Sequence, residues 1–338
     1  MVVIPALDLL FAARHENNRN MHWAWPFKAR NKCDRSETED GPLSVDACPD
    51  FLCIGAQKAG TTWLYQQLES HPDFWMPPFK ELHYLNDLGR VERAATPRRR
   101  DERDVLFLER LQKLTAEPSL SLRNYARLFE PKASLLSGDI TPGYSTLTDD
   151  IIGRVVAFFP ELKVIFLARD PVERAWSHLS MEVDCRQIEP FDVTDIDAVD
   201  RNLRRRGLLL RSYPSAVVAR WKRRVRADLF RVFFFDDLQK NPAELRRSIL
   251  LFLDADPDKP SGRRRADHNS WAGKEKLPFT NQARSHIAQF FKKELKACAT
   301  QLGGPARLWP ARYGFSLLWL IIDLLDDFDL FFWCNWVG

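Results

Sequence analysis

The residues between Phe51 and Glu69 constrain the fold of this chain more than any others. Phe51–Gly55 is a short apolar run that ends in glycine, and Thr61–Glu69 has the apolar spacing of a helix. The loop between them carries its glycines at the spacing of a phosphate-binding loop. Such a loop holds a polyanion through backbone N–H groups and the N-terminus of the following helix. We therefore expect strand, phosphate loop and helix in this order.

The same alternation returns twice further along the chain. Lys163–Ala168 is an apolar run, after which Asp170 suits an N-cap, Pro171 the first helical position and Glu173 the return bond of a capping box. Leu229–Phe235 is a third apolar run, and a helix capped by Asn241-Pro242 follows it.

Strands that alternate with helices predict a parallel sheet. The expected fold is α/β, a single P-loop-type domain whose central parallel sheet is flanked by helices. Ligands of such a sheet bind at the carboxyl ends of its strands. Gly55 and Arg169 both lie at such ends.

The two ends of the chain lack the alternation of predicted strands and helices that its middle shows. Residues 1–49 have no clear periodicity and predict an irregular arm before a domain over residues 50–304. Residues 305–338 form an apolar tail that four aspartates interrupt, so we expect no membrane-spanning helix there. The tail is expected to dock on its own domain, or to contact a membrane surface or an oligomer partner. Met1–Ala13 makes a poor signal peptide, and a cytoplasmic location is predicted.

Composition narrows the ligand classes. The formal net charge of +4 fits an anionic ligand and does not imply nucleic acid. The six cysteines contain no C-x-x-C pair, which argues against zinc ribbons and thioredoxin-like chemistry and predicts reduced thiols. No metal is expected.

Two motifs resemble those of sulfotransferases that use 3′-phosphoadenosine 5′-phosphosulfate as donor. The loop and helix start at 57–64, QKAGTTWL, are similar to the family's 5′-phosphosulfate loop, and 164–177, VIFLARDPVERAWS, to its 3′-phosphate motif. The segments at 79–84, 125–129, 138–144 and 234–238 are similar to the carbohydrate-modifying branch, which includes heparan sulfate sulfotransferases and bacterial relatives. The resemblance covers about residues 50–304.

The resemblance implies a donor site and a catalytic base. Lys58 would neutralise charge on the bridging oxygen of the donor, and Glu81 would act as general base, with His83 as the alternative. The residues that would bind the donor are Gln57, Lys58, Ala59, Gly60, Thr61, Thr62, Trp63, Arg169, Ser177, Gly273, Lys274 and Lys276. The implied reaction transfers a sulfuryl group to a hydroxyl or amine by in-line displacement, with a carbohydrate as the first choice of acceptor. Lipid, peptide and natural-product hydroxyls stay open.

Two other functions stay open. A phosphoryl-transferring kinase would need lysine directly after Gly60, where this chain has Thr61. A non-catalytic relative could bind a polyanion through the arginine runs at 98–100, 204–206 and 263–265. Intact Lys58 and Glu81 favour an enzyme.

Overall fold

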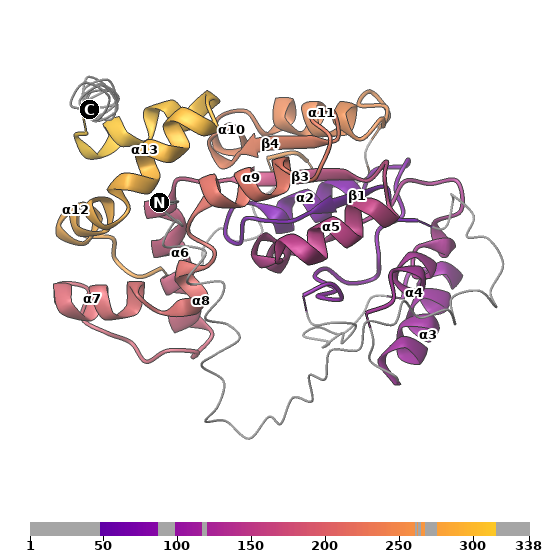
Figure 1. The fold of residues 1–338 in the computed structure, drawn as a ribbon, viewed down its shortest axis with the longest axis horizontal. Helices are drawn as coiled ribbons and strands as arrows, with labels where there is room; N and C mark the ends of the chain where they lie inside the picture. The colour runs from indigo at the N-terminus through magenta and orange to yellow at the C-terminus, as the bar shows by residue number, and fades with distance from the viewer. Residues whose placement is uncertain are drawn as a thin grey trace, which may run out of the picture.

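A computed structural model describes residues 48–86, 99–116, 120–260, 262, 265–267 and 276–315. These residues form one parallel sheet of four strands in the order β2-β1-β3-β4, with helices around it (Figure 1). The strands are β1 Phe51–Cys53, β2 Gly138–Ile140, β3 Lys163–Ala168 and β4 Phe230–Phe234. The helices are α2 Thr61–Glu69, α3 Glu102–Ala116, α4 Leu122–Arg127, α5 Asp149–Phe158, α6 Pro171–Asp184, α7 Ile196–Leu203, α8 Arg206–Leu209, α9 Pro214–Lys222, α10 Phe235–Lys240, α11 Pro242–Phe252, α12 Asn281–Phe290 and α13 Lys292–Gln301, with short 3₁₀ turns η3 Glu130–Lys132, η4 Pro142–Thr146, η5 Gly304–Leu308 and η6 Pro310–Tyr313.

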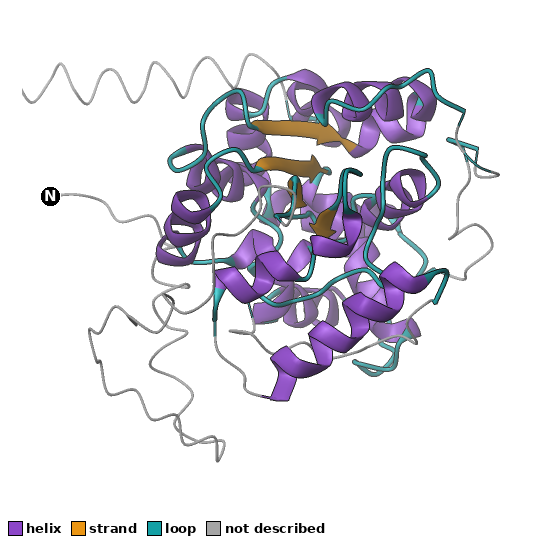
Figure 2. Ribbon diagram, turned by 90° about the vertical axis from the view of Figure 1, so that its right-hand side faces the viewer, coloured by secondary structure: helices purple, strands orange, loops and turns teal. Residues whose placement is uncertain are grey.

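The sheet is the centre of the hydrophobic core. β1 pairs with β2 on one side and with β3 on the other, and each residue of β1 is buried. Helices cover both faces of the strands, as Figure 2 shows. A parallel sheet covered in this way favours continuous apolar runs, which explains why β1 and β3 could be read from the sequence.

The strand order creates a switch point between β1 and β3. The chain leaves β1 towards β2 and then crosses back to β3, so right-handed connections put α2 and α5 on opposite faces. The crevice at the carboxyl ends of these strands is the usual ligand position in such sheets. In the plane of Figure 1, α3 and α4 lie at one end of the molecule and α12 and α13 at the other.

The predicted fold is confirmed, and α2 and β3 have the predicted bounds. The structure differs from the sequence predictions in several places, beginning with β1, which ends at Cys53 and not at Gly55. The third apolar run ends at Phe234 because α10 begins at Phe235. The edge strand β2 was missed, because its three residues include a charged one, Asp139. Glu173 does not make the capping-box bond among the contacts described, because its carboxylate pairs with Arg284 and Arg169.

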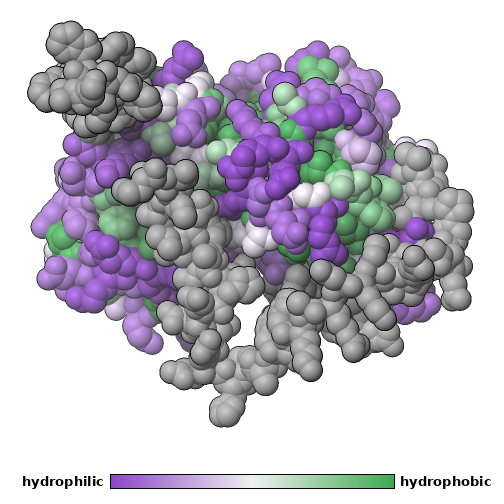
Figure 3. Space-filling view, viewed as in Figure 1, coloured by the Kyte–Doolittle hydropathy of each residue, from purple (hydrophilic) through white to green (hydrophobic). Residues whose placement is uncertain are grey.

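Residues 305–315, assigned to the tail from sequence, pack against the domain. Ala306 and Trp309 are fully buried in the core, while 316–338 and the arm at 1–47 lie outside the described residues. On the face in Figure 3, polar and apolar side chains are interspersed. The exposed large apolar side chains Val105, Leu106, Leu251 and Leu308 belong to three different elements. The described cysteines, at 48, 53, 185 and 298, are free thiols.

Candidate active site

The phosphate loop follows β1 and ends at the N-terminus of α2. Gly60 is the N-cap residue of α2, with φ 95°, and no side chain of the described residues caps this helix end. The first N–H groups of a helix have no intrahelical acceptor, so they are available to an anion. A Cβ on Gly60 would lie 2.6 Å from Leu238 Cδ2, and its φ of 95° is one that residues with a Cβ rarely adopt, so this position favours glycine. The structure thus brings together the seven loop residues predicted from sequence, 57–63.

Arg169 joins this loop to the carboxyl end of β3. Its guanidinium donates a 2.6 Å hydrogen bond to the Lys58 carbonyl and lies 4.4 Å from the Phe235 ring centroid. Burial lowers its pKa. Within the described part of the chain, Arg169 Nε and Gln57 Oε1 are buried without a hydrogen-bond partner. A buried donor of this kind calls for an anionic acceptor.

Ser177 is half-buried on α6, about two turns from the start of that helix. The neighbouring Trp176 stacks on Phe279 at 4.7 Å and donates to the Leu277 carbonyl at 3.1 Å. Its side chain therefore ties residues 277–279 to the helix that carries Ser177.

A second tryptophan, Trp63, contacts the chain at Ala266, before residues 277–279. Trp63 is buried in the first turn of α2 and donates a 2.7 Å hydrogen bond to the Ala266 carbonyl. Gly273 and Lys274 lie outside the described residues, and Lys276 is exposed. The two tryptophans thus attach the residues on either side of 268–275 to the predicted donor site.

Glu81 and His83 lie on the irregular segment after Pro78. His83 Nε2 is 3.5 Å from Glu81 Oε2, and Lys80 Nζ contacts Glu81 Oε1. Burial would raise the pKa of Glu81, but the hydrogen bond from His83 and the charge of Lys80 outweigh it and lower that pKa to about 2. Both residues have left-handed backbones, with φ 68° and 56°. Such strain in residues other than glycine is typical of functional sites.

A buried carboxylate supports this segment. Asp139 on β2 accepts hydrogen bonds from Tyr144 (2.6 Å), Thr141 (2.7 Å) and Tyr125 (3.0 Å), and burial raises its pKa. Thr141 Oγ1 in turn accepts a long 3.5 Å bond from the His83 N–H. We name these four residues, Asp139, Tyr125, Thr141 and Tyr144, the Asp139 network. Their segments, 125–129 and 138–144, resemble the carbohydrate branch, but no catalytic or binding role was predicted for these four side chains.

Gly143 leaves room for the His83 ring. A Cβ at this position would lie 3.2 Å from His83 Nδ1 and 3.2 Å from Asn86 Oδ1. The same two atoms are 3.1 Å from each other. The ring of His83 is therefore held between Asn86 and the backbone of η4.

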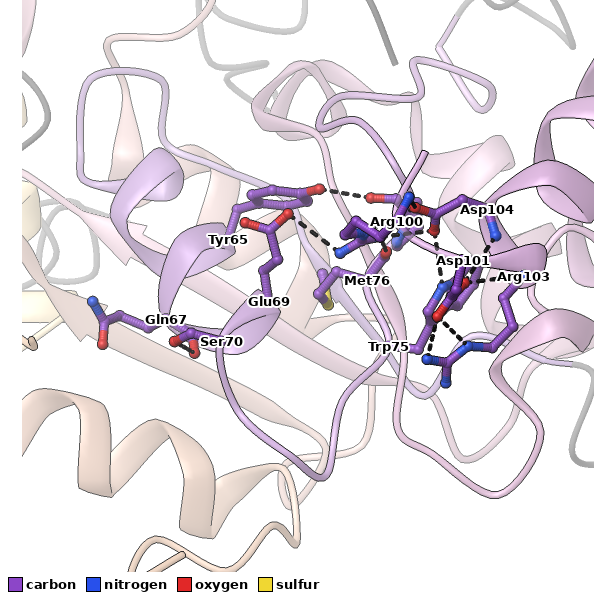
Figure 4. A network of polar contacts seen from close by, with 11 residues as sticks. Tyr65, Gln67, Glu69, Ser70, Trp75, Met76, Arg100, Asp101, Arg103 and Asp104 are labelled. Carbon is purple, nitrogen blue, oxygen red and sulfur yellow. Dashed lines mark hydrogen bonds and ion pairs between the residues drawn. The ribbon is translucent and has the colours of Figure 1, made fainter. Parts of the chain in front are cut away.

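Of the six described arginines in the runs at 98–100, 204–206 and 263–265, four pair with carboxylates of the chain, whereas no ion pair is described for the exposed Arg99 and Arg206. Arg100 contacts both oxygens of Asp104 and reaches Glu69, and Arg103 pairs with Asp101 (Figure 4). Elsewhere in the described residues the pairs are Arg204 with Asp200, Arg205 with Glu182 and Arg265 with Asp267. Arg98, Arg263 and Arg264 lie outside the described residues. Paired guanidinium groups offer little net charge to an external polyanion.

Comparison with known proteins gives one family. The sequence model of the sulfotransferase family matches residues 49–259, more than half of the chain. The chain is also 27% identical over 166 residues to the membrane-associated sulfotransferase kil1 of Dictyostelium discoideum. That alignment covers 46% of this chain and 29% of the relative, so the chain spans less than a third of the relative's length.

A solved structure shares the fold. The sulfotransferase of Alicyclobacillus acidocaldarius superposes with a TM-score of 0.55 at 20% identity, covering 80% of this chain and 98% of the other.

The predicted cytoplasmic location is contradicted by these comparisons, because the relative from Dictyostelium is membrane-associated. That prediction depended on the poor resemblance of Met1–Ala13 to a signal peptide and on the aspartates in the tail, and neither feature determines where a protein acts. Within the described ranges, no helix combines the length and the hydropathy that a bilayer crossing requires.

Proposed function

Because the chain belongs to the sulfotransferase family, we propose that this sulfotransferase takes its sulfuryl group from 3′-phosphoadenosine 5′-phosphosulfate. The acceptor is a hydroxyl or amine, with a carbohydrate as the preferred class. One observation carries the choice of donor. Arg169, at the end of β3, donates to the Lys58 carbonyl of the phosphate loop, so two anion-binding elements lie against each other. This arrangement suits a nucleotide with separate 5′- and 3′-phosphate groups.

The loop residues bind and neutralise the donor. Backbone N–H groups at the N-terminus of α2, with the hydroxyls of Thr61 and Thr62, hold the 5′-phosphate. The Lys58 ammonium neutralises charge that grows on the bridging oxygen as the sulfur–oxygen bond breaks. Arg169 and Ser177 hold the 3′-phosphate, and the guanidinium offers paired hydrogen bonds for it. Gly273, Lys274 and Lys276 complete the site in this proposal, as the resemblance implies.

Glu81 accepts the proton of the attacking acceptor. A carboxylate with a pKa of about 2 is a weak base, so the acceptor must loosen the contacts that Lys80 and His83 make with it. His83 Nε2 lies 3.5 Å away, which makes it the second candidate for the base. A general base needs hydrogen-bond reach to the acceptor proton, and both side chains sit on the same short segment.

Nucleotide binding tests the donor. Calorimetry with adenosine 3′,5′-bisphosphate and with ATP should give tighter binding of the bisphosphate, without added magnesium. Magnesium-dependent preference for ATP would instead support the kinase alternative. That alternative is disfavoured by Thr61, which stands where the kinase loop has lysine.

An acceptor screen tests the reaction. The protein is incubated with sulfur-labelled donor and with carbohydrate, lipid, peptide and small natural-product acceptors, and each product is analysed by intact mass. We expect the gain of one sulfuryl group on a carbohydrate, because residues 79–84 are similar to the carbohydrate branch. Transfer only to another class would reject the acceptor and keep the reaction. Donor binding without any transfer would favour a non-catalytic relative.

A further inference from the structure

Arg169 is surrounded by carboxylates. Glu173 lies 3.9 Å from its guanidinium, and Asp170 is the adjacent residue. Asp236 follows Phe235, whose ring covers the guanidinium. Burial, the larger effect, lowers the pKa of Arg169, and the charges of all three carboxylates raise it. Without further cationic partners, these three carboxylates would repel a phosphate that approached Arg169, since like charges in a poorly solvated site interact strongly.

Two further arginines, Arg284 and Arg312, form ion pairs that offset the negative charge of these carboxylates. Arg284 pairs with Glu173 at 2.5 Å. Arg312 lies between the other two, with NH1 3.5 Å from Asp170 Oδ2 and NH2 in contact with Asp236 Oδ1. The charge of Arg169 is therefore left available to a ligand.

Arg312 is held in place by its neighbours. Tyr313 donates a 2.8 Å hydrogen bond to Asp170 Oδ2, and Trp309 donates to the Asp236 carboxylate at 3.2 and 3.3 Å. We name Trp309, Arg312 and Tyr313 the C-terminal latch. It lies beyond residue 259, where the match to the family ends.

Asp170 is the point at which latch and donor site meet. This carboxylate is buried, caps α6 through the Val172 N–H at 3.0 Å and directly follows Arg169. Burial raises its pKa to about 6, against the hydrogen bond from Tyr313. The other groups that face it are Arg312 and, with the same sign of charge, Glu173. Loss of the latch would leave this carboxylate short of partners beside the phosphate-binding arginine.

We infer that Arg312 and Tyr313 are positioning residues for the donor, which orient the Arg169 segment and neutralise its carboxylates so that Arg169 can recognise a 3′-phosphate. The inference rests on the proposed function, because it assumes a donor with that phosphate. It makes the C-terminal segment a part of the donor site.

The test compares adenosine 3′,5′-bisphosphate with adenosine 5′-monophosphate, which lacks the 3′-phosphate, on the full chain. Calorimetry gives the affinity ratio for the wild type, Arg312→Ala, Arg312→Lys and Tyr313→Phe. Arg307→Ala is the matched control, because it removes the same charge from an exposed position on η5. Thermal unfolding of each variant is recorded alongside.

We expect Arg312→Ala to weaken binding of the bisphosphate about tenfold, equivalent to about 1.4 kcal/mol, with little change for the monophosphate. Arg312→Lys should recover part of the ratio, Tyr313→Phe should lower it by a smaller factor, and Arg307→Ala should leave it unchanged. Equal weakening of both nucleotides, or a lower melting temperature with an unchanged ratio, would show that the latch only stabilises the fold and would overturn the inference. A wild type that does not distinguish the two nucleotides would reject the proposed donor itself, before any variant is compared.

Discussion

The proposed donor side (residues 57–63 and Arg169) and the proposed catalytic segment (residues 80–83) are built in different ways. On the donor side, the phosphate loop and Arg169 stand at the ends of adjacent strands, and the following helices begin at fixed positions. Glu81 and His83 instead lie on irregular chain with left-handed backbones. Regular elements position the first group, whereas the second depends on side chains that come from β2, α4 and η4.

The two groups of residues should therefore respond differently to substitution. Changes on the donor side should alter nucleotide affinity or the stabilisation of the leaving group. Changes in the catalytic segment or the Asp139 network should alter turnover with little effect on donor affinity. Substitutions in each group should therefore separate an effect on turnover from an effect on donor affinity.

Glu81→Gln keeps the shape of the side chain but cannot accept a proton. We expect turnover to fall by about 10²–10⁴, the range for loss of a general base, with donor affinity unchanged. Single-turnover assays and calorimetry measure the two quantities. An active Glu81→Gln beside an inactive His83→Ala would transfer the role to His83.

The pH profile sharpens the same point. Because the pKa of Glu81 is held at about 2, its carboxylate is largely ionised at pH values well above 2. Turnover that depends on this carboxylate should therefore be lost only as the pH falls through about 2. Lys80→Met removes one cause of the low pKa, so the acid limb should move to higher pH. An unmoved limb would show that another group controls it.

Lys58→Ala probes the donor side at the chemical step. Removal of one charge that stabilises the transition state should lower turnover by about 10²–10³, with only moderate loss of affinity for adenosine 3′,5′-bisphosphate. Arg169→Ala should show the opposite pattern, because a charge-assisted phosphate contact contributes about 1.5–3 kcal/mol to binding. Equal losses of affinity and turnover in Lys58→Ala would contradict its role in the chemical step.

Gly143→Ala tests whether the catalytic segment depends on its support. The added Cβ would lie 3.2 Å from the His83 ring, which must shift by a few tenths of an ångström. We expect about a tenfold loss of turnover, since small displacements of catalytic groups reduce rates strongly. Gly153→Ala on α5 is the control, because its Cβ would meet no atom within 4 Å. Similar rates for both variants would show that the segment tolerates the shift.

Glu294 belongs to neither the proposed donor side nor the proposed catalytic segment. Its substitution should therefore have the smallest effect on catalysis. It is buried on α13 and accepts hydrogen bonds from Ser215 N–H (2.9 Å) and Oγ (2.8 Å). Burial raises its pKa to about 7, so its contribution to stability is complete below about pH 4.5 and is lost as the pH rises through 7. Glu294→Gln should flatten the decline of the melting temperature between about pH 4.5 and 7, where each kcal/mol corresponds to about 2–4 °C. Unchanged pH dependence would assign that decline to other groups.

The strand and helix ends of the proposed donor side could be predicted from sequence because their signals are local. Gly60 and Asp170 are the N-cap residues of α2 and α6, where residue type and short-range spacing determine the conformation. The Asn241 cap of α11 was readable for the same reason, and its side chain accepts from the Glu244 N–H.

The support of the catalytic segment could not be predicted in this way. Asp139 stands among apolar residues on a strand of three, and its hydroxyl partners reach it only once β2, α4 and η4 have packed together. The pairing of Arg312 with Asp170 joins residues 142 positions apart, a contact that no local pattern encodes. The polar residue within Gly138–Ile140 was the one available signal, since a buried carboxylate requires partners.

The position of the latch along the chain affects when the protein becomes functional during its synthesis. Translation proceeds from the N-terminus, yet Trp309 belongs to the core and Tyr313 bonds to Asp170 across 143 positions. A nascent chain that has exposed the phosphate loop, β3 and α6 therefore still lacks the residues that complete the surroundings of Arg169. We expect ribosome-bound chains that end before residue 309 to bind adenosine 3′,5′-bisphosphate more weakly than chains that include residue 313, because they lack Arg312 and Tyr313.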